Sequence, residues 1–229
     1  MEKLPHNSNY DRIQRRLTIL LRLFLVVGIG VEAAEQLWGN VVIASGILLL
    51  TYLPAILARR ADVHVPPEFE VLTIAFIIAS LFLGEVRDYY NTFWWWDIAL
   101  HGTSGGLLGV LGVLLIYVLN ETPQIDLQMR PGFVAFFAFC FALSVGAIWE
   151  IFEFTMDQYF GMNMQKPMWG DPSGLTDTMI DLIVDAIGAL IVSVVGYIYM
   201  VRGYESIIDR GIQRFIARNP RLFSRGQTK

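Results

Sequence analysis

The chain has 229 residues, of which 55% are hydrophobic and only 17% are charged, and its mean hydropathy is +0.50. This composition is too apolar for a soluble domain and predicts an integral membrane protein. At roughly 20 residues for each membrane crossing, the length suits one bundle of about six spans, with little material left for a domain outside the membrane.

Six apolar stretches follow one another along the chain. Residues 1–16 are polar and basic, and we expect them to form a short cytoplasmic segment before the first span. The spans themselves are expected at residues 17–37, 41–58, 69–84, 95–119, 133–156 and 177–201. Pro54 predicts a kink or an end within the second span, because proline lacks the N–H that an α-helix needs. The predicted fold is therefore an all-α, polytopic transmembrane bundle over residues 17–201.

The basic C-terminal segment, residues 202–229, has a different pattern. Its apolar side chains fall on one helical face and its arginines on the other, as in Ile208, Ile212 and Phe215 against Arg210, Arg214 and Arg218. This pattern predicts an amphipathic interfacial helix on the cytoplasmic membrane surface, with membrane lipids as its partner. A basic segment this short does not indicate nucleic-acid binding.

Lysine and arginine gather on one side of the predicted spans. Only Arg87 and Lys166 fall on the other side. Because basic residues stay on the cytoplasmic side of a membrane protein, both termini are expected in the cytoplasm.

Three aspartates lie four residues apart on the sixth predicted span: Asp177, Asp181 and Asp185. On a helix they fall within roughly 80° of arc and descend about 12 Å along the axis. A carboxylate at the centre of a bilayer costs about 2.5–3.5 kcal/mol on insertion scales. Three on one face therefore require protons, a base or a metal ion.

Two other spans carry similar groups at the same predicted outer end. Asp97 and His101 lie one turn apart on the fourth span, and Glu150, Glu153 and Asp157 lie on the fifth. Glycines on the fourth and sixth spans predict that these helices approach each other closely. Glu32 and Glu35, near the end of the first span, are interpreted as solvated boundary residues.

This mixture of one imidazole and several carboxylates suits a divalent metal. The candidate ligands are Asp97, His101, Glu150, Asp181 and Asp185, and the candidate catalytic residues are Glu153 and Asp177. Magnesium or manganese is favoured, since zinc usually binds more nitrogen or sulfur ligands, and the Glu-x-x-His pattern of di-iron helices does not occur around His101.

Three ordered motifs carry a resemblance to a known family. They are Trp96-Asp97-x-x-x-His101-x-x-Ser104-Gly105, then Trp149-Glu150-x-x-Glu153, then Asp177-Thr178-x-x-Asp181-x-x-x-Asp185-x-x-Gly188-Ala189. The region 88–196 resembles the YjdF-like family of bacterial inner-membrane proteins and, more distantly, VanZ-like proteins. The resemblance implies a helical membrane fold with these acids in a common cluster, and it names no substrate.

The leading functional hypothesis is a metal-dependent hydrolase or transferase acting on a lipid-linked or envelope substrate at the outer leaflet. One alternative is a small proton- or cation-coupled transporter that uses Asp181, Asp185 and Glu150 as a relay. Another is a non-catalytic membrane assembly subunit whose acids only join helices. The apolar run after Asp185 favours a closed outer site over a continuous pathway.

Overall fold

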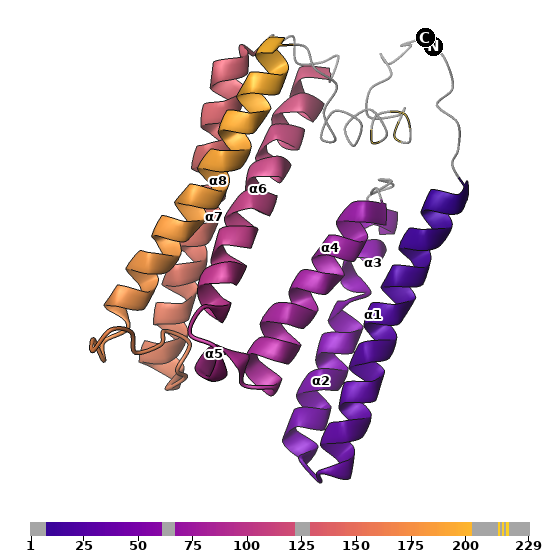
Figure 1. Ribbon diagram of the computed structural model, residues 1–229, viewed down its shortest axis with the longest axis vertical. Coiled ribbons are helices and arrows are strands. Elements are labelled where there is room, and N and C mark those ends of the chain that lie inside the picture. The colour runs from indigo at the N-terminus through magenta and orange to yellow at the C-terminus, as the bar shows by residue number, and fades with distance from the viewer. Residues whose placement is uncertain are drawn as a thin grey trace. The chain divides into compact units, whose positions relative to one another are not determined.

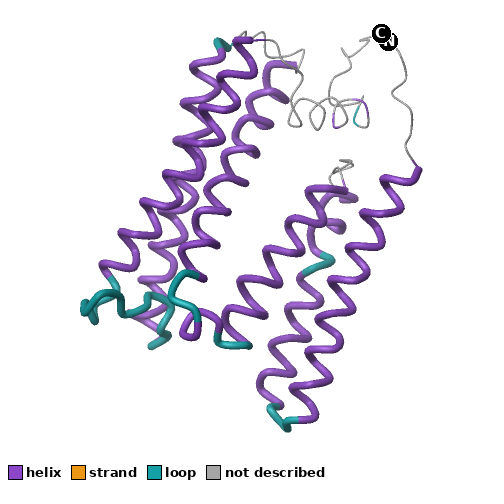
Figure 2. The backbone as a smooth tube through the Cα atoms, in the orientation of Figure 1, coloured by secondary structure: helices purple, strands orange, loops and turns teal. Residues whose placement is uncertain are grey.

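The computed structural model describes residues 8–60, 67–121 and 129–202, together with the single positions Phe215, Ala217 and Asn219. Apart from one isolated bridge between Met168 and Asp171, all regular structure in these residues is helical, which confirms the all-α class (Figure 2). Six helices in the described part are long and apolar enough to cross a membrane, as predicted. The amphipathic helix expected in residues 202–229 lies almost entirely outside the described residues.

The chain forms two compact units, Met1–Trp94 and Trp95–Lys229, and each is described by itself. The elements of the first unit are α1 (Ser8–Ala34), α2 (Trp38–Leu50), α3 (Leu53–Arg60), α4 (Pro67–Ile77), the π-helix η1 (Ile78–Val86) and α5 (Tyr89–Thr92) (Figure 1). Helix α1 begins at Ser8, so the helix extends into the polar segment that precedes the predicted first span.

The second predicted span is interrupted close to its proline. Helix α2 ends at Leu50 and α3 begins at Leu53, just before Pro54. Proline has no N–H to donate and its ring crowds the carbonyl four residues earlier, so the helical hydrogen bonds stop there. The interruption agrees with the predicted kink.

Arginine 22 of α1 lies beside this interruption. Its Nε donates to Thr51 Oγ1 at 3.2 Å and its Nη2 to the Thr51 carbonyl at 3.0 Å. Glu70 Oε1 lies 3.4 Å from Nη2, and the guanidinium stacks 4.0 Å from the centre of the Tyr52 ring. These contacts supply a partner for a carbonyl near the end of α2 and compensate the charge of Arg22 within the first unit.

Glu32 is buried, contrary to the interpretation of a solvated boundary residue. Its side chain is 1% exposed, accepts a hydrogen bond from Asn40 at 2.9 Å and pairs with Arg87 at 2.8 Å. The π-helical turn of η1 precedes Arg87, whose backbone N–H donates to the Phe82 carbonyl five residues back. The hydrogen bond with Glu32 raises the pKa of Arg87, so the guanidinium carries its charge in this pair.

Three long helices make up the described core of the second unit: α6 (Trp96–Glu121), α7 (Pro131–Phe160) and α8 (Leu175–Arg202). They run side by side, each in contact with the other two (Figure 1). A Cβ at Gly188 of α8 would collide with the Gly102 carbonyl of α6, and one at Gly105 would collide with the Asp185 backbone. The glycines therefore allow near backbone contact between α6 and α8, as predicted.

One face of α8 is buried from Asp177 to Gly196. Its buried residues recur about every four positions: Asp177, Asp181, Asp185, Ala189, Ser193 and Gly196. The half of the unit away from the acids packs through an apolar cluster of Val113, Ile116, Val134 and Ala138. The acids are thus concentrated at the end where α6 and α8 begin and α7 ends.

We predict that the Glu32–Arg87 pair stabilises the first unit. Arg87→Met leaves a buried carboxylate with Asn40 as its remaining partner, and we expect a loss on the order of 1–3 kcal/mol in the free energy of unfolding. The measurement is thermal unfolding in detergent, with exposed Arg60→Met as the control. A double-mutant cycle with Glu32→Gln that gives no interaction energy would contradict this prediction.

Candidate functional site

All seven predicted site residues lie at the same end of the second unit. Helix α6 contributes Asp97 and His101, α7 contributes Glu150 and Glu153, and α8 contributes Asp177, Asp181 and Asp185. Six of the seven are buried, and the side chain of the seventh, Asp97, is 18% exposed. The four-residue spacing on α8 and the close approach of α6 together bring these groups into one cluster.

The imidazole of His101 is at the centre of the cluster. Its Nδ1 lies 3.3 Å from Asp185 Oδ2, within hydrogen-bond distance. The other oxygen of Asp185 accepts a hydrogen bond from the Ser104 hydroxyl at 2.9 Å. On the opposite side of the ring, Nε2 lies 3.7 Å from Asp97 Oδ1 and 3.7 Å from Glu150 Oε1. His101 therefore faces carboxylates on both sides.

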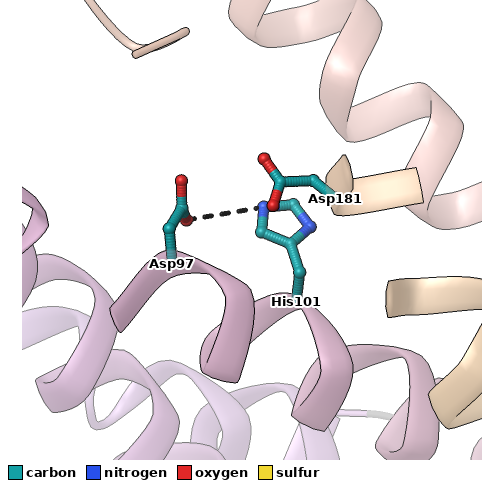
Figure 3. Close-up of side chains that lie close together, drawn as sticks. All are labelled: Asp97, His101 and Asp181. Atoms are coloured by element: carbon teal, nitrogen blue, oxygen red, sulfur yellow. Dashed lines mark ion pairs between the residues drawn. The ribbon is translucent and has the colours of Figure 1, made fainter. Parts of the chain in front are cut away.

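Asp181 approaches this imidazole from α8 (Figure 3). One side-chain donor atom from each of Asp97, His101 and Asp181 lies within 4.8 Å of the other two. These three residues come from two helices, and in the described part of the chain theirs is the set of possible metal ligands whose donor atoms lie this close together.

Several carboxylate oxygens of this cluster have no hydrogen-bond partner among the described residues. They are both oxygens of Glu150, both oxygens of Asp181 and Oδ1 of Asp177. The Thr178 hydroxyl interacts with Glu150 but does not reach hydrogen-bond geometry. Glu150 is 4% exposed and Asp181 is fully buried, so hydrogen bonds from the described residues do not compensate the desolvation of these two carboxyl groups.

Glu153 has a different environment from the other acids. Its Oε1 accepts a hydrogen bond from the indole Nε1 of Trp149 at 2.9 Å. Trp149 lies one turn earlier on α7 and remains 44% exposed, next to the exposed Phe152 ring. This pair links the buried cluster to the outer surface of α7.

The loop between α7 and α8 is attached to the acids through its backbone. Asp157 accepts hydrogen bonds from the N–H groups of Met164 and Gln165 at 2.7 and 2.9 Å. Asp177 Oδ2 accepts one from the Lys166 N–H at 2.7 Å, and the Gln165 amide donates to Thr178. Asp157 follows Glu150 and Glu153 on the same predicted span, but its carboxylate binds the loop and not the cluster.

Asp171 caps the start of α8 from the same loop. Its carboxylate accepts hydrogen bonds from the hydroxyl and N–H groups of Ser173 and Thr176. The hydrogen bonds from Ser173, followed by those from Thr176, hold the pKa of Asp171 well below its usual range. A carboxyl group with a lowered pKa stabilises the fold above its unfolded pKa, and this contribution is lost only in strong acid.

Two residues of the site were not identified as such from the sequence. Ser104 fixes the orientation of Asp185, and Gly146 of α7 leaves the space that the Asp185 carboxylate fills. The available signal was spacing, because Gly146 precedes Glu150 by one helical turn and so shares its buried face.

Comparisons with known proteins address the membrane assignment. Residues 14–202 match the family model described as "Predicted membrane protein (DUF2238)". The chain belongs to this family. It is also 24% identical over 146 residues to an uncharacterized protein of Thermotoga maritima, an alignment that covers 64% of this chain and 70% of the relative. No solved structure matches the chain. The protein is therefore an integral membrane protein of this family.

We predict that Gly146→Ala disturbs the cluster. The added Cβ would overlap Asp185 Oδ2, so the carboxylate would have to move away from its position beside His101. We expect a cost of about 1–3 kcal/mol in unfolding free energy, typical of an overpacked core. Gly132→Ala is the matched control on α7, because its Cβ would lie 4.0 Å from the Tyr197 ring. Equal thermal stability of the two variants would contradict the prediction.

Proposed function

We propose that the protein is a metal-dependent hydrolase or transferase that acts on a lipid-linked or envelope substrate at the membrane surface. The observation that carries this proposal is the set of buried, unpartnered oxygens of Glu150, Asp181 and Asp177 around the imidazole of His101. Ionisable groups within membrane spans are expensive and usually serve a function. A divalent cation would compensate several of these carboxylates at once.

The donor set supports magnesium or manganese. We propose Asp97, His101, Glu150 and Asp181 as ligands, since hard carboxylate oxygens suit these ions. Opposite ligands of Mg²⁺ lie about 4.2 Å apart and adjacent ones about 2.9 Å, and any three ligands include at least two adjacent pairs. Donor atoms that lie within 4.8 Å of one another would therefore have to move inward by distances on the order of an ångström to bind one ion.

Asp185, predicted from the sequence to be a ligand, fits a positioning role better. It lies at Nδ1 of His101, on the other side of the ring from Asp97 and Glu150. A metal-bound histidine commonly donates its second ring N–H to a carboxylate, which fixes the orientation of the ring. Ser104 in turn fixes Asp185.

Helix lengths support a site at the level of the lipid headgroups. Glu150 follows Arg130, the residue before α7, by twenty positions, or about 30 Å of helix. Asp181 precedes Arg202, at the far end of α8, by twenty-one positions, or about 32 Å. Both lengths are close to the roughly 30 Å thickness of the hydrocarbon core. If the basic residues lie at one boundary, the acid cluster lies at the other.

The chemistry proposed for this site is attack by water or an alcohol on a polarised phosphoryl or acyl group. A bound divalent ion would supply the polarisation. We assign to Glu153 the role of accepting the proton of the attacking group, and the Trp149 N–H, which holds one of its oxygens, supports a fixed orientation for it. Asp177 stays a candidate for the same acid–base work.

The cellular setting is part of the proposal. The lysine and arginine distribution supports cytoplasmic termini and an outward-facing site in a bacterial inner membrane. The YjdF-like and VanZ-like resemblance of region 88–196 supports the same setting and stays a prediction.

A second candidate function is a proton or cation pathway. Ser193 lies two turns beyond Asp185 on the same buried face of α8, and its hydroxyl has no partner among the described residues. Ala189 separates the two on that face, which favours a closed site. A non-catalytic assembly subunit is the third hypothesis, in which the acids only join α6, α7 and α8.

We predict stoichiometric metal in the tag-free protein purified in detergent. Asp181→Asn and Glu150→Gln remove proposed ligands and should abolish binding, whereas Asp157→Asn, which changes a loop anchor, should retain it. Elemental analysis after incubation with Mg²⁺, Mn²⁺ or Zn²⁺ measures the content. Binding should weaken as the pH falls, because protons compete for the ligands.

A wild-type protein that binds none of these ions would refute the metal site. A proton-flux assay in liposomes would then separate the remaining hypotheses. Flux lost in Asp181→Asn supports the pathway, and no flux with lowered stability in the variant supports helix packing.

A further inference from the structure

A single ion at the proposed ligands leaves part of the cluster uncompensated. An ion held by Asp97, His101, Glu150 and Asp181 through one oxygen of each carboxylate would leave the other oxygens of Glu150 and Asp181 without a partner among the described residues. The second oxygen of Asp181, at least one oxygen of Glu150 and Oδ1 of Asp177 remain buried and without a hydrogen bond from the described residues. A buried polar oxygen in this state is costly, so it indicates a missing ligand.

Asp177 is buried and held in a fixed orientation, as expected for a residue that binds such a ligand. Its side chain is 1% exposed, and its Oδ2 is fixed by the Lys166 N–H at 2.7 Å. It lies one turn from Asp181 on the same face of α8, about 6 Å along the axis. It is also near enough to Glu150 and Asp97 for their charges to interact.

The charge balance agrees with the unpartnered oxygens. Six carboxylates form the cluster: Asp97, Glu150, Glu153, Asp177, Asp181 and Asp185. Lys166 and His101 are the cationic side chains whose charges act on Asp177 among the described residues. If all six carboxyl groups are ionised, one divalent ion together with Lys166 would leave about half of the negative charge uncompensated, and a second divalent ion would remove most of the remainder.

We propose that the cluster holds a second divalent cation, bound by Asp177 and sharing Asp181 and Glu150 with the first ion. This inference rests on the proposed metal site. In two-metal hydrolytic sites the ions lie about 3.5–4 Å apart and are bridged by carboxylates, which suits acids one helical turn apart. Asp177 is thereby a ligand of the second ion and not an acid–base catalyst.

The test uses the full chain, without a tag, in detergent, with Mn²⁺ as the probe. We expect two manganese ions for each wild-type chain and one in Asp177→Asn. Asparagine keeps a side-chain oxygen for the Lys166 N–H, so the loop contact is preserved. Asp181→Asn should lose both ions, and Asp157→Asn should keep both. The electron paramagnetic resonance spectrum should change from that of a coupled pair in the wild type to that of an isolated ion in Asp177→Asn.

The outcomes separate this inference from the proposed function. One ion in the wild type, unchanged in Asp177→Asn, overturns the second position and leaves the first in place. No ion in the wild type overturns both. If Asp177→Asn unfolds, Asp177→Glu takes its place in the test. Because glutamate retains a carboxylate, this variant should keep two ions and the spectrum of a coupled pair. A single uncoupled ion in the folded Asp177→Glu variant would count against the proposal.

Discussion

The near contact between the backbones of α6 and α8 is the constraint on which the candidate site depends. Gly105 and Gly188 allow this approach, because any larger side chain at either position would meet the opposite backbone. The same approach puts His101 of α6 within hydrogen-bond distance of Asp185 of α8. Without it, the acids of α8 would face lipid or apolar side chains at a much higher cost.

The two units compensate their buried charges in different ways. In the described part of the first unit, Glu32 pairs with Arg87 and Arg22 pairs with Glu70. In the second unit the acids outnumber the nearby cations, and Asp181 lacks any hydrogen bond from the described residues. Charges that pair internally compensate each other, whereas an unmatched set of one sign requires protons, a base or a bound cation. This contrast favours the second unit as the part of the protein that carries the functional site.

Much of the fold could be predicted because hydropathy and helix length are local properties. The six spans and the interruption before Pro54 follow from runs of apolar residues and from the missing proline N–H. The shared face of Asp177, Asp181 and Asp185 follows from the 3.6-residue period, and the structure places it in the interior.

Other features depend on how helices rotate and meet, which spacing does not determine. The burial of Glu32 requires Arg87, which is 55 residues away and follows a π-helical turn. Asp185 lies at the Nδ1 side of the His101 imidazole because of how α8 is rotated relative to α6. Asp157 binds backbone N–H groups of the loop between α7 and α8. Every residue except proline carries such a group, so no sequence motif predicts this contact.

The hydrogen bond between Trp149 and Glu153 has an optical consequence. An indole whose N–H is held by a carboxylate changes its emission when that carboxylate gains a proton or turns toward a new neighbour. Trp149 is 44% exposed on α7 while its partner is buried in the cluster. One of the six tryptophans of the chain therefore lies at the edge of the candidate site, where its emission can report changes in the acid cluster once the other five are replaced.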